Sequence, residues 1–161
     1  MAIDEAVFRD ALGQLASGVA VISARVDGED HGFTATSFTS LSLDPMLVLV
    51  CVVKAQRSHL QLEQAGHYAV SVLGGAQREL GLRFAVEEPG QRFAGVAVSR
   101  AATGAPILQG SIAWVDCRIR EIVPGGDHSI FIGEVLAAGV QASDDALIYH
   151  NRQWGRFRAD E

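Results

Sequence analysis

The residues best suited to chemistry in this sequence stand at 54–58, Lys-Ala-Gln-Arg-Ser, directly after a long apolar run. A short helix is expected from about residue 59 to 65. The free N–H groups of a helix N-terminus, together with Lys54, Arg57 and the hydroxyl of Ser58, suit a bound phosphate. The alternative is a plain helix start with two solvated cations, and the segment alone leaves both interpretations open.

A second stretch, from Gly32 to Pro45, is prone to form strand but carries six hydroxyl side chains and one charge, Asp44. A strand that serves only the core would carry Val and Ile, and one that faces water would carry Lys and Glu. The pattern therefore suits a surface against a large, flat, neutral ligand that forms hydrogen bonds. An ordinary half-buried strand whose hydroxyls pair across the sheet is the alternative.

The free energy needed for binding connects these two segments. A helix terminus contributes up to ~2 kcal/mol, whereas micromolar binding requires ~8 kcal/mol. A phosphate anchor alone cannot hold a ligand, so most of the binding energy must come from a flat ring packed on an apolar surface. Residues 32–45 supply such a surface.

Other candidates are weaker on their own. His128 opens a strand after the turn at 125–127, yet a lone His is commonly a satisfied surface or core residue. Ser17 stands beside a glycine that ends a helix, and Tyr149 suits a core or interface anchor as well as a site. Phe84 is most simply the inner end of a helix.

Nucleophile elbows, phosphate-binding glycine loops and isolated carboxylate pairs are missing from the sequence. Such a chain can still catalyse a reaction if a cofactor carries the chemistry and the protein holds it. No catalytic side chain is therefore expected.

Length and composition indicate one domain over residues 1–161, with 48% hydrophobic and 20% charged residues. The net charge of −6 and the lack of a basic stripe argue against nucleic acid. No metal is expected, because the five histidines make no ligand pattern. Cys51 and Cys117 predict reduced thiols in a cytoplasmic protein. Neither a signal peptide nor an apolar run of membrane-spanning length is found, so no membrane partner is expected.

Periodicity predicts about seven strands and two or three short helices, hence an all-β barrel or sandwich. The expected elements are a helix at 5–17 ended by Gly18, strands at 19–26 and 32–45 joined by the Asp27-Gly28 turn, a central strand at 46–53 apolar on both faces, a helix at 59–65 with a Ser58/Gln61 capping box and closed by Gly66, a strand at 68–73, a helix at 76–85, an irregular stretch at 86–110, strands at 111–123 and 128–140, and a strand-like segment at 147–149. In the strand at 111–123, Asp116 is expected on the polar face.

Taken in order, these segments resemble the flavin reductase family, whose members supply reduced flavin to two-component monooxygenases. The resemblance runs from Phe8 to Phe157 and rests on the order and spacing of several pieces. They are Phe-Arg-Asp-Ala-Leu at 8–12, Ala-Ser-Gly-Val-Ala-Val at 16–21, Gly-x-Thr-Ala-x-Ser-Phe at 32–38, Ser-Leu-Asp-Pro at 42–45, Ala-Val-Ser-Val-Leu at 69–73, Arg-Phe-Ala-Gly-Val at 92–96, Gly-Asp-His at 126–128 and Ile-Gly-Glu-Val at 132–135.

The resemblance implies a Greek-key FMN-binding split barrel and a homodimer with the flavin near the subunit interface. It assigns residues by position in three groups. Thr36, Ser37, Phe38, Thr39 and Ser42 would line the isoalloxazine; Lys54, Gln56, Arg57 and Ser58 would hold the ribityl phosphate, with Phe84 near the flavin; Ser17, His128 and Tyr149 would lie near the nicotinamide. Gln56 and Arg57 stand where small hydroxyl residues are frequent in the family, which leaves the choice between FMN and FAD open.

The implied activity is that of an NAD(P)H:flavin oxidoreductase, in which hydride passes from nicotinamide C4 to flavin N5. Free FMN or FAD would be reduced by NADH or NADPH, and reduced flavin would pass to a partner monooxygenase. The protein would act by alignment, with His128 positioning the nicotinamide. A non-catalytic flavin-binding electron carrier of the same fold and an interaction protein without a ligand are the competing hypotheses.

Overall fold

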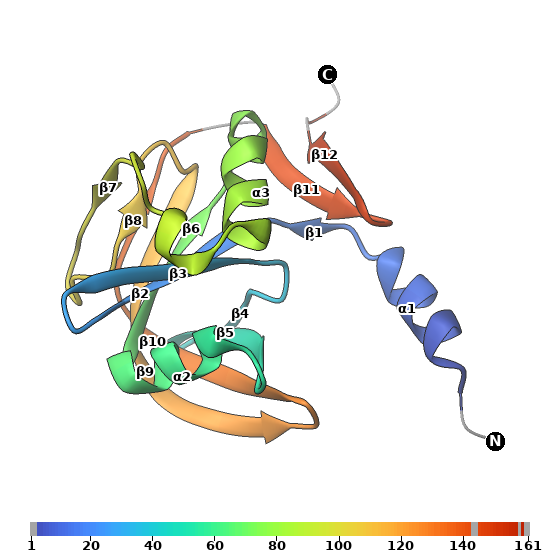
Figure 1. Ribbon diagram of the computed structural model, residues 1–161, viewed down its shortest axis with the longest axis horizontal. Coiled ribbons are helices and arrows are strands. Elements are labelled where there is room, and N and C mark those ends of the chain that lie inside the picture. The colour runs from blue at the N-terminus through green and yellow to red at the C-terminus, as the bar shows by residue number, and fades with distance from the viewer. Residues whose placement is uncertain (1–2, 143–144, 158, 160–161) are drawn as a thin grey trace.

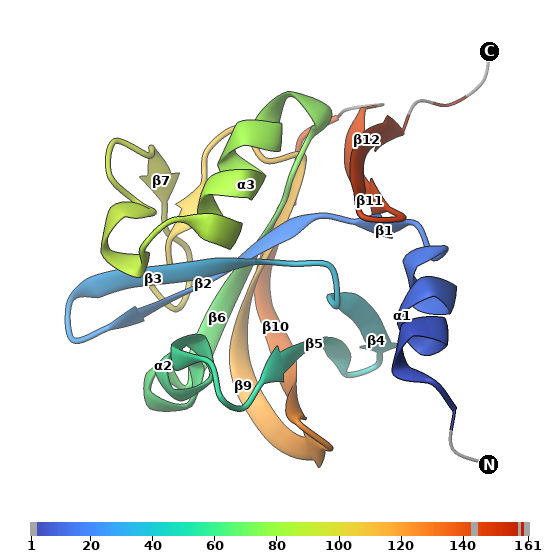
Figure 2. The same cartoon turned by 45° about the vertical axis from the view of Figure 1, so that its right-hand side comes forward.

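The computed structural model describes residues 3–142, 145–157 and 159, and a curled seven-stranded antiparallel sheet forms its centre (Figure 1, Figure 2). The strands run in the order β3-β2-β6-β9-β10-β5-β4. Their bounds are β2 Ala20–Val26, β3 Glu29–Ala35, β4 Thr39–Leu43, β5 Met46–Val53, β6 His67–Val72, β9 Ala113–Gly125 and β10 His128–Val140. The two edge strands, β3 and β4, follow one another along the chain, so residues 36–38 bridge the open side of the sheet.

Two smaller sheets and a few short helices surround this one. The smaller sheets contain β1 Ser17–Gly18, β11 Ala146–His150 and β12 Gln153–Phe157, and β7 Val98–Ser99 with β8 Ile107–Leu108. The helices are α1 Glu5–Gly13, α2 Arg57–Ala65, α3 Arg78–Val86 and the 3-10 turns η1 Gly75–Gln77 and η2 Pro89–Gln91. The prediction of an all-β architecture with a few short helices is confirmed.

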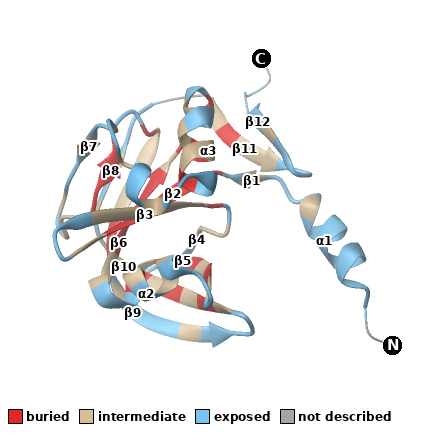
Figure 3. Cartoon of the chain, in the orientation of Figure 1, coloured by how far each residue is buried: buried red, intermediate tan, exposed pale blue. Residues whose placement is uncertain are grey.

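The core occupies the inside of the curled sheet and the space under α3 (Figure 3). Val50 and Phe131 are fully buried inside the sheet, and Phe84 of α3 is fully buried in the second cluster. In contrast, α1 has no buried residue and projects away from the rest of the chain in Figure 1. No helix of the described residues is long and apolar enough to cross a bilayer.

Several local predictions are confirmed. The β2–β3 turn lies at Asp27 and Gly28, whose φ angles of 50° and 84° are the left-handed pair that a tight hairpin requires. Gly66 ends α2 in the left-handed conformation. The strand at 46–53 has the predicted bounds, but β5 lies next to an edge and buries only alternate residues. The expectation of a central strand buried on both faces is wrong, because the outer face of this part of the barrel is uncovered.

The first helix is shorter than predicted. It ends at Gly13, and Ser17–Gly18 form β1, which pairs with Tyr149 and Ile148. Gly18 therefore lies in a strand and does not end the helix. The pairing partner lies far away in sequence, so helical periodicity could not reveal it.

The stretch from 32 to 45 is not one strand. Residues 36–38 break it, so that β3 pairs with β2 while β4 pairs with β5 at the opposite edge. Ser37 fixes the break, since its Oγ donates to the carbonyl of Cys51 at 2.9 Å and accepts from the N–H of Cys51 at 3.2 Å.

Three further predictions are corrected. Gln56, not Ser58, caps α2, and no side chain forms a cap hydrogen bond there. Asp116 lies on the face of β9 opposite Cys117, as expected, but it is fully buried and accepts hydrogen bonds from Thr103, because the segment that contains Thr103 and Ala105 covers this face. Strand β12 was not expected, since the β11–β12 turn at Asn151 and Arg152 contains no glycine although both residues have positive φ.

Candidate functional site

A cleft of about 330 Å³, here called the α2 cleft, lies between the start of α2, the end of β3 and α3. Its lining residues are Phe33, Thr34, Gln56, Arg57, Ser58, Gln61, Phe84, Ala85, Pro89 and Arg92. None of them carries a carboxylate, whereas two carry a guanidinium. The cleft therefore presents an unbalanced positive charge.

The two arginines of the α2 cleft are held differently. Arg57 is the first residue of α2 and is exposed, and its side chain makes no hydrogen bond or ion pair within the described part of the chain. Arg92 donates to the carbonyls of Gly32 and Glu87 at 2.8 and 2.9 Å, and burial lowers its pKa. A fixed cation and a free one beside the N–H groups of a helix start form a site for an anion such as phosphate.

The wall of the α2 cleft is apolar and rigid. Phe84 packs edge-on against Phe93, with ring centroids 4.8 Å apart. Gly32 of β3 permits this packing, because a Cβ there would lie 3.0 Å from Phe84 and 3.1 Å from Phe93. Thr34 ties β3 to α3 by donating from Oγ1 to the carbonyl of Gly81 at 2.6 Å.

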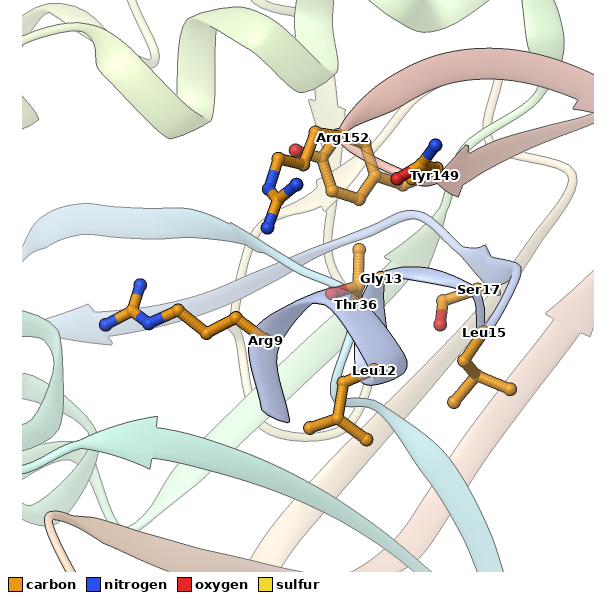
Figure 4. Close-up of a pocket in the computed structure, with 9 residues that line it drawn as sticks. Arg9, Leu12, Gly13, Leu15, Ser17, Thr36, Tyr149 and Arg152 are labelled. Atoms are coloured by element: carbon orange, nitrogen blue, oxygen red, sulfur yellow. The ribbon is translucent and has the colours of Figure 1, made fainter. Parts of the chain in front are cut away.

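A second cleft of about 340 Å³, here called the α1 cleft, lies between α1 and the β11–β12 turn (Figure 4). Its lining residues are Arg9, Leu12, Gly13, Leu15, Ser17, Thr36, Tyr149, Asn151 and Arg152. Ser17 and Tyr149 face each other in the register of β1 and β11. The structure thus brings two of the three residues expected near the nicotinamide into one cleft.

Few interactions hold α1 against this cleft. The N–H of Asn151 donates to the carbonyl of Gly13 at 2.6 Å, and Arg152 pairs with Asp10 at 2.6 Å. Both partners of the ion pair are largely exposed, so the pair contributes little to the position of the helix. Leu12 and Leu15, which line the cleft, are 56% and 69% exposed.

The end of β3 connects the two clefts. Thr34 lines the α2 cleft and Thr36, just past the strand, lines the α1 cleft. Alternate residues of an extended chain point to the same side. A long flat ligand with one end at Arg57 can therefore follow this segment toward Ser17 and Tyr149.

Other residues expected at the ring take different positions. The hydroxyl of Ser37 is used by Cys51, and Phe38 packs against the core of the barrel. Thr39 and Ser42 belong to β4 and line neither cleft.

Lys54 and His128 form a separate group. Lys54 Nζ donates to the carbonyl of Gly126 at 2.7 Å, and His128 Nδ1 lies 2.7 Å from a carboxylate oxygen of Asp127. The hydrogen bond with His128 lowers the pKa of Asp127. This group at the β9–β10 turn lines neither cleft.

Sequence reasoning missed several lining residues. In the α2 cleft they are Thr34, Gln61 and Arg92, and in the α1 cleft they are Arg9, Leu12, Asn151 and Arg152. Arg92 lies within a stretch that looked irregular, and only its place in the Arg-Phe-Ala-Gly-Val segment marked it. Its place in the α2 cleft depends on the packing of η2 against β3.

Comparison with known proteins gives a consistent result. Residues 12–158 match the family described as flavin reductase like domain. The chain is 39% identical over 155 residues to the actinorhodin polyketide dimerase of Streptomyces coelicolor, which covers 96% of this chain and 87% of that protein. It is 36% identical over 160 residues to HsaB of Rhodococcus jostii, the reductase subunit of a flavin-dependent monooxygenase, with 99% of this chain and 82% of that one covered.

Among solved structures, the NADH:FAD oxidoreductase SgcE6 of Streptomyces globisporus superposes with a TM-score of 0.91 at 35% identity, covering 99% of this chain and 98% of that one. A second structure of that protein is in complex with NAD and FAD fragments. The similarity confirms the split-barrel fold that the sequence resemblance implies.

Proposed function

The chain belongs to the flavin reductase-like family and is a flavin reductase, and from this premise we propose where it holds its two substrates. The α2 cleft takes the phosphate end of the flavin, and the α1 cleft takes the nicotinamide nucleotide. The observation that carries this assignment is the unpaired guanidinium of Arg57 beside Arg92 in a cleft lined by no carboxylate.

The residues of the α2 cleft fit a flavin phosphate in charge and in donors. Arg57, Gln56 and Ser58 offer side-chain donors at the start of α2, and Arg92 is a second cation. A hydrogen bond to a charged group contributes about 1.5–3 kcal/mol. Phe33, half-buried in the wall, gives the adjoining part of the flavin an apolar surface, and the fully buried Phe84 supports that wall from behind. Lys54 adds positive charge from the neighbouring turn.

We propose that the flavin ring lies along residues 36–39, with Ser42 beyond. Thr36 is exposed and in the α1 cleft, so its hydroxyl is available to the polar edge of the ring. Ser37 and Phe38 contribute through the backbone shape of the break that they fix. When bound, the flavin supplies the redox chemistry of the reaction by accepting hydride from the reduced nicotinamide.

Within the α1 cleft, Ser17 and Tyr149 would donate hydrogen bonds that orient the nicotinamide over the open face of the flavin site. The work of these side chains is alignment, which removes much of the entropic barrier of a two-substrate step. His128 lines neither cleft of its own chain. Its proposed contact with the nicotinamide is therefore made across a subunit interface.

A homodimer supplies that interface. Apolar side chains on α1 and just before it are exposed to solvent: Phe8 is 51%, Val7 59% and Ile3 72% exposed. At the end of β4, Leu43 is 91% exposed. Burying each large apolar side chain contributes about 1.5–3 kcal/mol. Association of two copies through α1 would cover this surface and close the α1 cleft.

For the substrates themselves we propose FMN or FAD and NADH or NADPH, delivered as free nucleotides. Reduced flavin would pass to a partner monooxygenase, since HsaB is named as the reductase subunit of such a system. Both cysteines are free, which fits a single domain of residues 1–161 working in the cytoplasm.

The test is steady-state oxidation of NADH or NADPH by the purified protein with free FMN or FAD. Accelerated oxidation with at least one combination is expected. No acceleration with either flavin and either nicotinamide nucleotide would overturn the proposed function.

A further inference from the structure

A third cleft, here called the hairpin cleft, opens on the other side of Arg57. Its volume is about 480 Å³, within the range of about 300–1,000 Å³ typical of small-molecule sites. Its lining residues are Arg25, Gly28, Glu29, Asp30, His31, Arg57, Pro89, Gly90 and Phe93. Arg57 and Pro89 also line the α2 cleft, so the two clefts meet at the unpaired cation.

The charges of the hairpin cleft nearly cancel. Asp30 accepts from Arg25 at 2.7 Å and from Arg100 at 2.7 and 3.0 Å. Burial raises the pKa of Asp30, but these hydrogen bonds outweigh it and hold the pKa below its usual value. Glu29 and Arg57 are the remaining lining charges, of opposite sign. Away from Arg57 the cleft thus suits an uncharged group.

Flat and hydrogen-bonding surfaces line the same cleft. Phe93 is half-buried and fixed edge-on against Phe84, which lines the α2 cleft. His31 Nδ1 lies 2.8 Å from Nε2 of Gln61, and burial and the charge of Arg57 lower the pKa of His31. The ring is therefore neutral at pH 7, and with the amide of Gln61 donating to Nδ1, its Nε2–H remains a donor. An aromatic ring with a neutral donor nearby recognises a heterocyclic base.

We propose that the hairpin cleft binds the adenosine half of FAD, with the pyrophosphate at Arg57, and that the protein therefore prefers FAD to FMN. The proposal rests on the proposed function, in which the α2 cleft holds the phosphate attached to the flavin. FMN ends at that phosphate and leaves the hairpin cleft to water. FAD continues past Arg57 into a space that already contains Phe93, Pro89 and His31.

Equilibrium titration of the full-length protein with FAD, FMN and riboflavin tests this preference. Stacking of a base on an aromatic side chain changes affinity by roughly 5- to 150-fold, so FAD should bind at least about fivefold more tightly than FMN. Equal dissociation constants for FAD and FMN would overturn the adenosine site and leave the proposed function intact. Failure of all three flavins to bind would overturn the proposed function, and this inference with it.

A substitution that fills the hairpin cleft sharpens the test. Gly90 lines the hairpin cleft but not the α2 cleft. Its φ angle is not positive, and a Cβ added there would meet no atom within 4 Å, so the backbone accepts a side chain at this position. Gly90→Trp should reduce the preference for FAD to about twofold or less and leave the dissociation constant of FMN unchanged. Gly155→Trp, at a similarly open glycine of β12, is the matched control and should keep the full preference. A Gly90→Trp protein that still prefers FAD as strongly as the unsubstituted protein would contradict the assignment.

Discussion

The α2 cleft and the α1 cleft differ in how the protein builds them. The first is enclosed by β3, α2 and α3, all packed on buried residues such as Phe84 and Leu62, and Thr34 links two of its walls. The second is bounded on one side by α1, which buries none of its residues. The α2 cleft is therefore complete within a single chain. In the α1 cleft, the wall formed by α1 is not packed against the core of its own chain.

This difference between the clefts bears on how each of the two substrates is bound. In the α2 cleft Arg92 is already held by two hydrogen bonds, so fewer side chains must be ordered when an anion binds, whereas a site with a loosely held wall gains affinity only when something orders that wall. We infer that flavin affinity belongs to the single chain and that nicotinamide affinity depends on the dimer. Substitutions in one cleft should therefore leave binding in the other unchanged.

The largest expected effect is on association. Phe8→Asp removes an apolar contact worth about 1.5–3 kcal/mol, and a two-fold interface contains that contact twice. The variant should run as a monomer in light scattering, with a raised KM for NADH and an FMN dissociation constant within about twofold of the original. Leu60→Asp, an equally exposed position on α2, is the control. If light scattering gave the Phe8→Asp protein the same oligomer mass as the unsubstituted protein, α1 would not form the subunit interface.

Arg57→Ala removes a positive charge from the α2 cleft. Loss of a charge-assisted hydrogen bond should weaken FMN binding by about 1.5–3 kcal/mol, roughly 10- to 150-fold. Riboflavin, which has no phosphate, should bind as before, and the KM for NADH should not change. Arg78→Ala, at an exposed position of α3 that lines neither cleft, serves as the control in fluorescence titrations. Equal losses for FMN and riboflavin would contradict the role of Arg57.

Removing single hydroxyls from the α1 cleft should have a smaller effect. Ser17→Ala and Tyr149→Phe each delete one neutral hydrogen bond of about 0.5–1.5 kcal/mol, so the KM for NADH should rise by about two- to tenfold. Flavin affinity should stay constant, as measured on the same preparations. If either variant weakened FMN binding and left the KM for NADH alone, the two clefts would be wrongly assigned.

The smallest effect concerns His31, whose pKa is lowered from 6.5 by burial and then by the charge of Arg57. As the pH falls below 6.5 the unfolded chain binds this proton first, so the free energy of unfolding decreases with falling pH until the lowered pKa is passed. In an NMR titration, Arg57→Ala should raise the pKa of His31, and bound FMN should raise it in the original protein. An unchanged pKa in both cases would show that Arg57 does not act on this ring.

Local signals in the sequence predicted much of the barrel but less of its site. Strand β5 and the turn at Asp27 and Gly28 follow from side-chain pattern and glycine conformation, both of which act between near neighbours. The start of α2 was placed within two residues, although the cap is Gln56. Each of these features depends on a few adjacent residues.

The clefts themselves depend on contacts between distant segments. Ser17 meets Tyr149 across 132 residues because β1 pairs with β11, and Arg92 reaches Gly32 because η2, which Arg92 follows, packs on β3. Nothing in the pattern around 86–110 indicates that an arginine there lines a cleft with Arg57. Such contacts are set by tertiary packing, which a single sequence does not display.

A crystal structure of the protein soaked with FMN would locate the flavin directly. We expect the phosphate between Arg57 and Arg92 in the α2 cleft, with the flavin ring following the end of β3 toward Thr36. A flavin bound with its phosphate in the α1 cleft, or crystals whose α2 cleft stays empty at saturating FMN, would contradict this expectation.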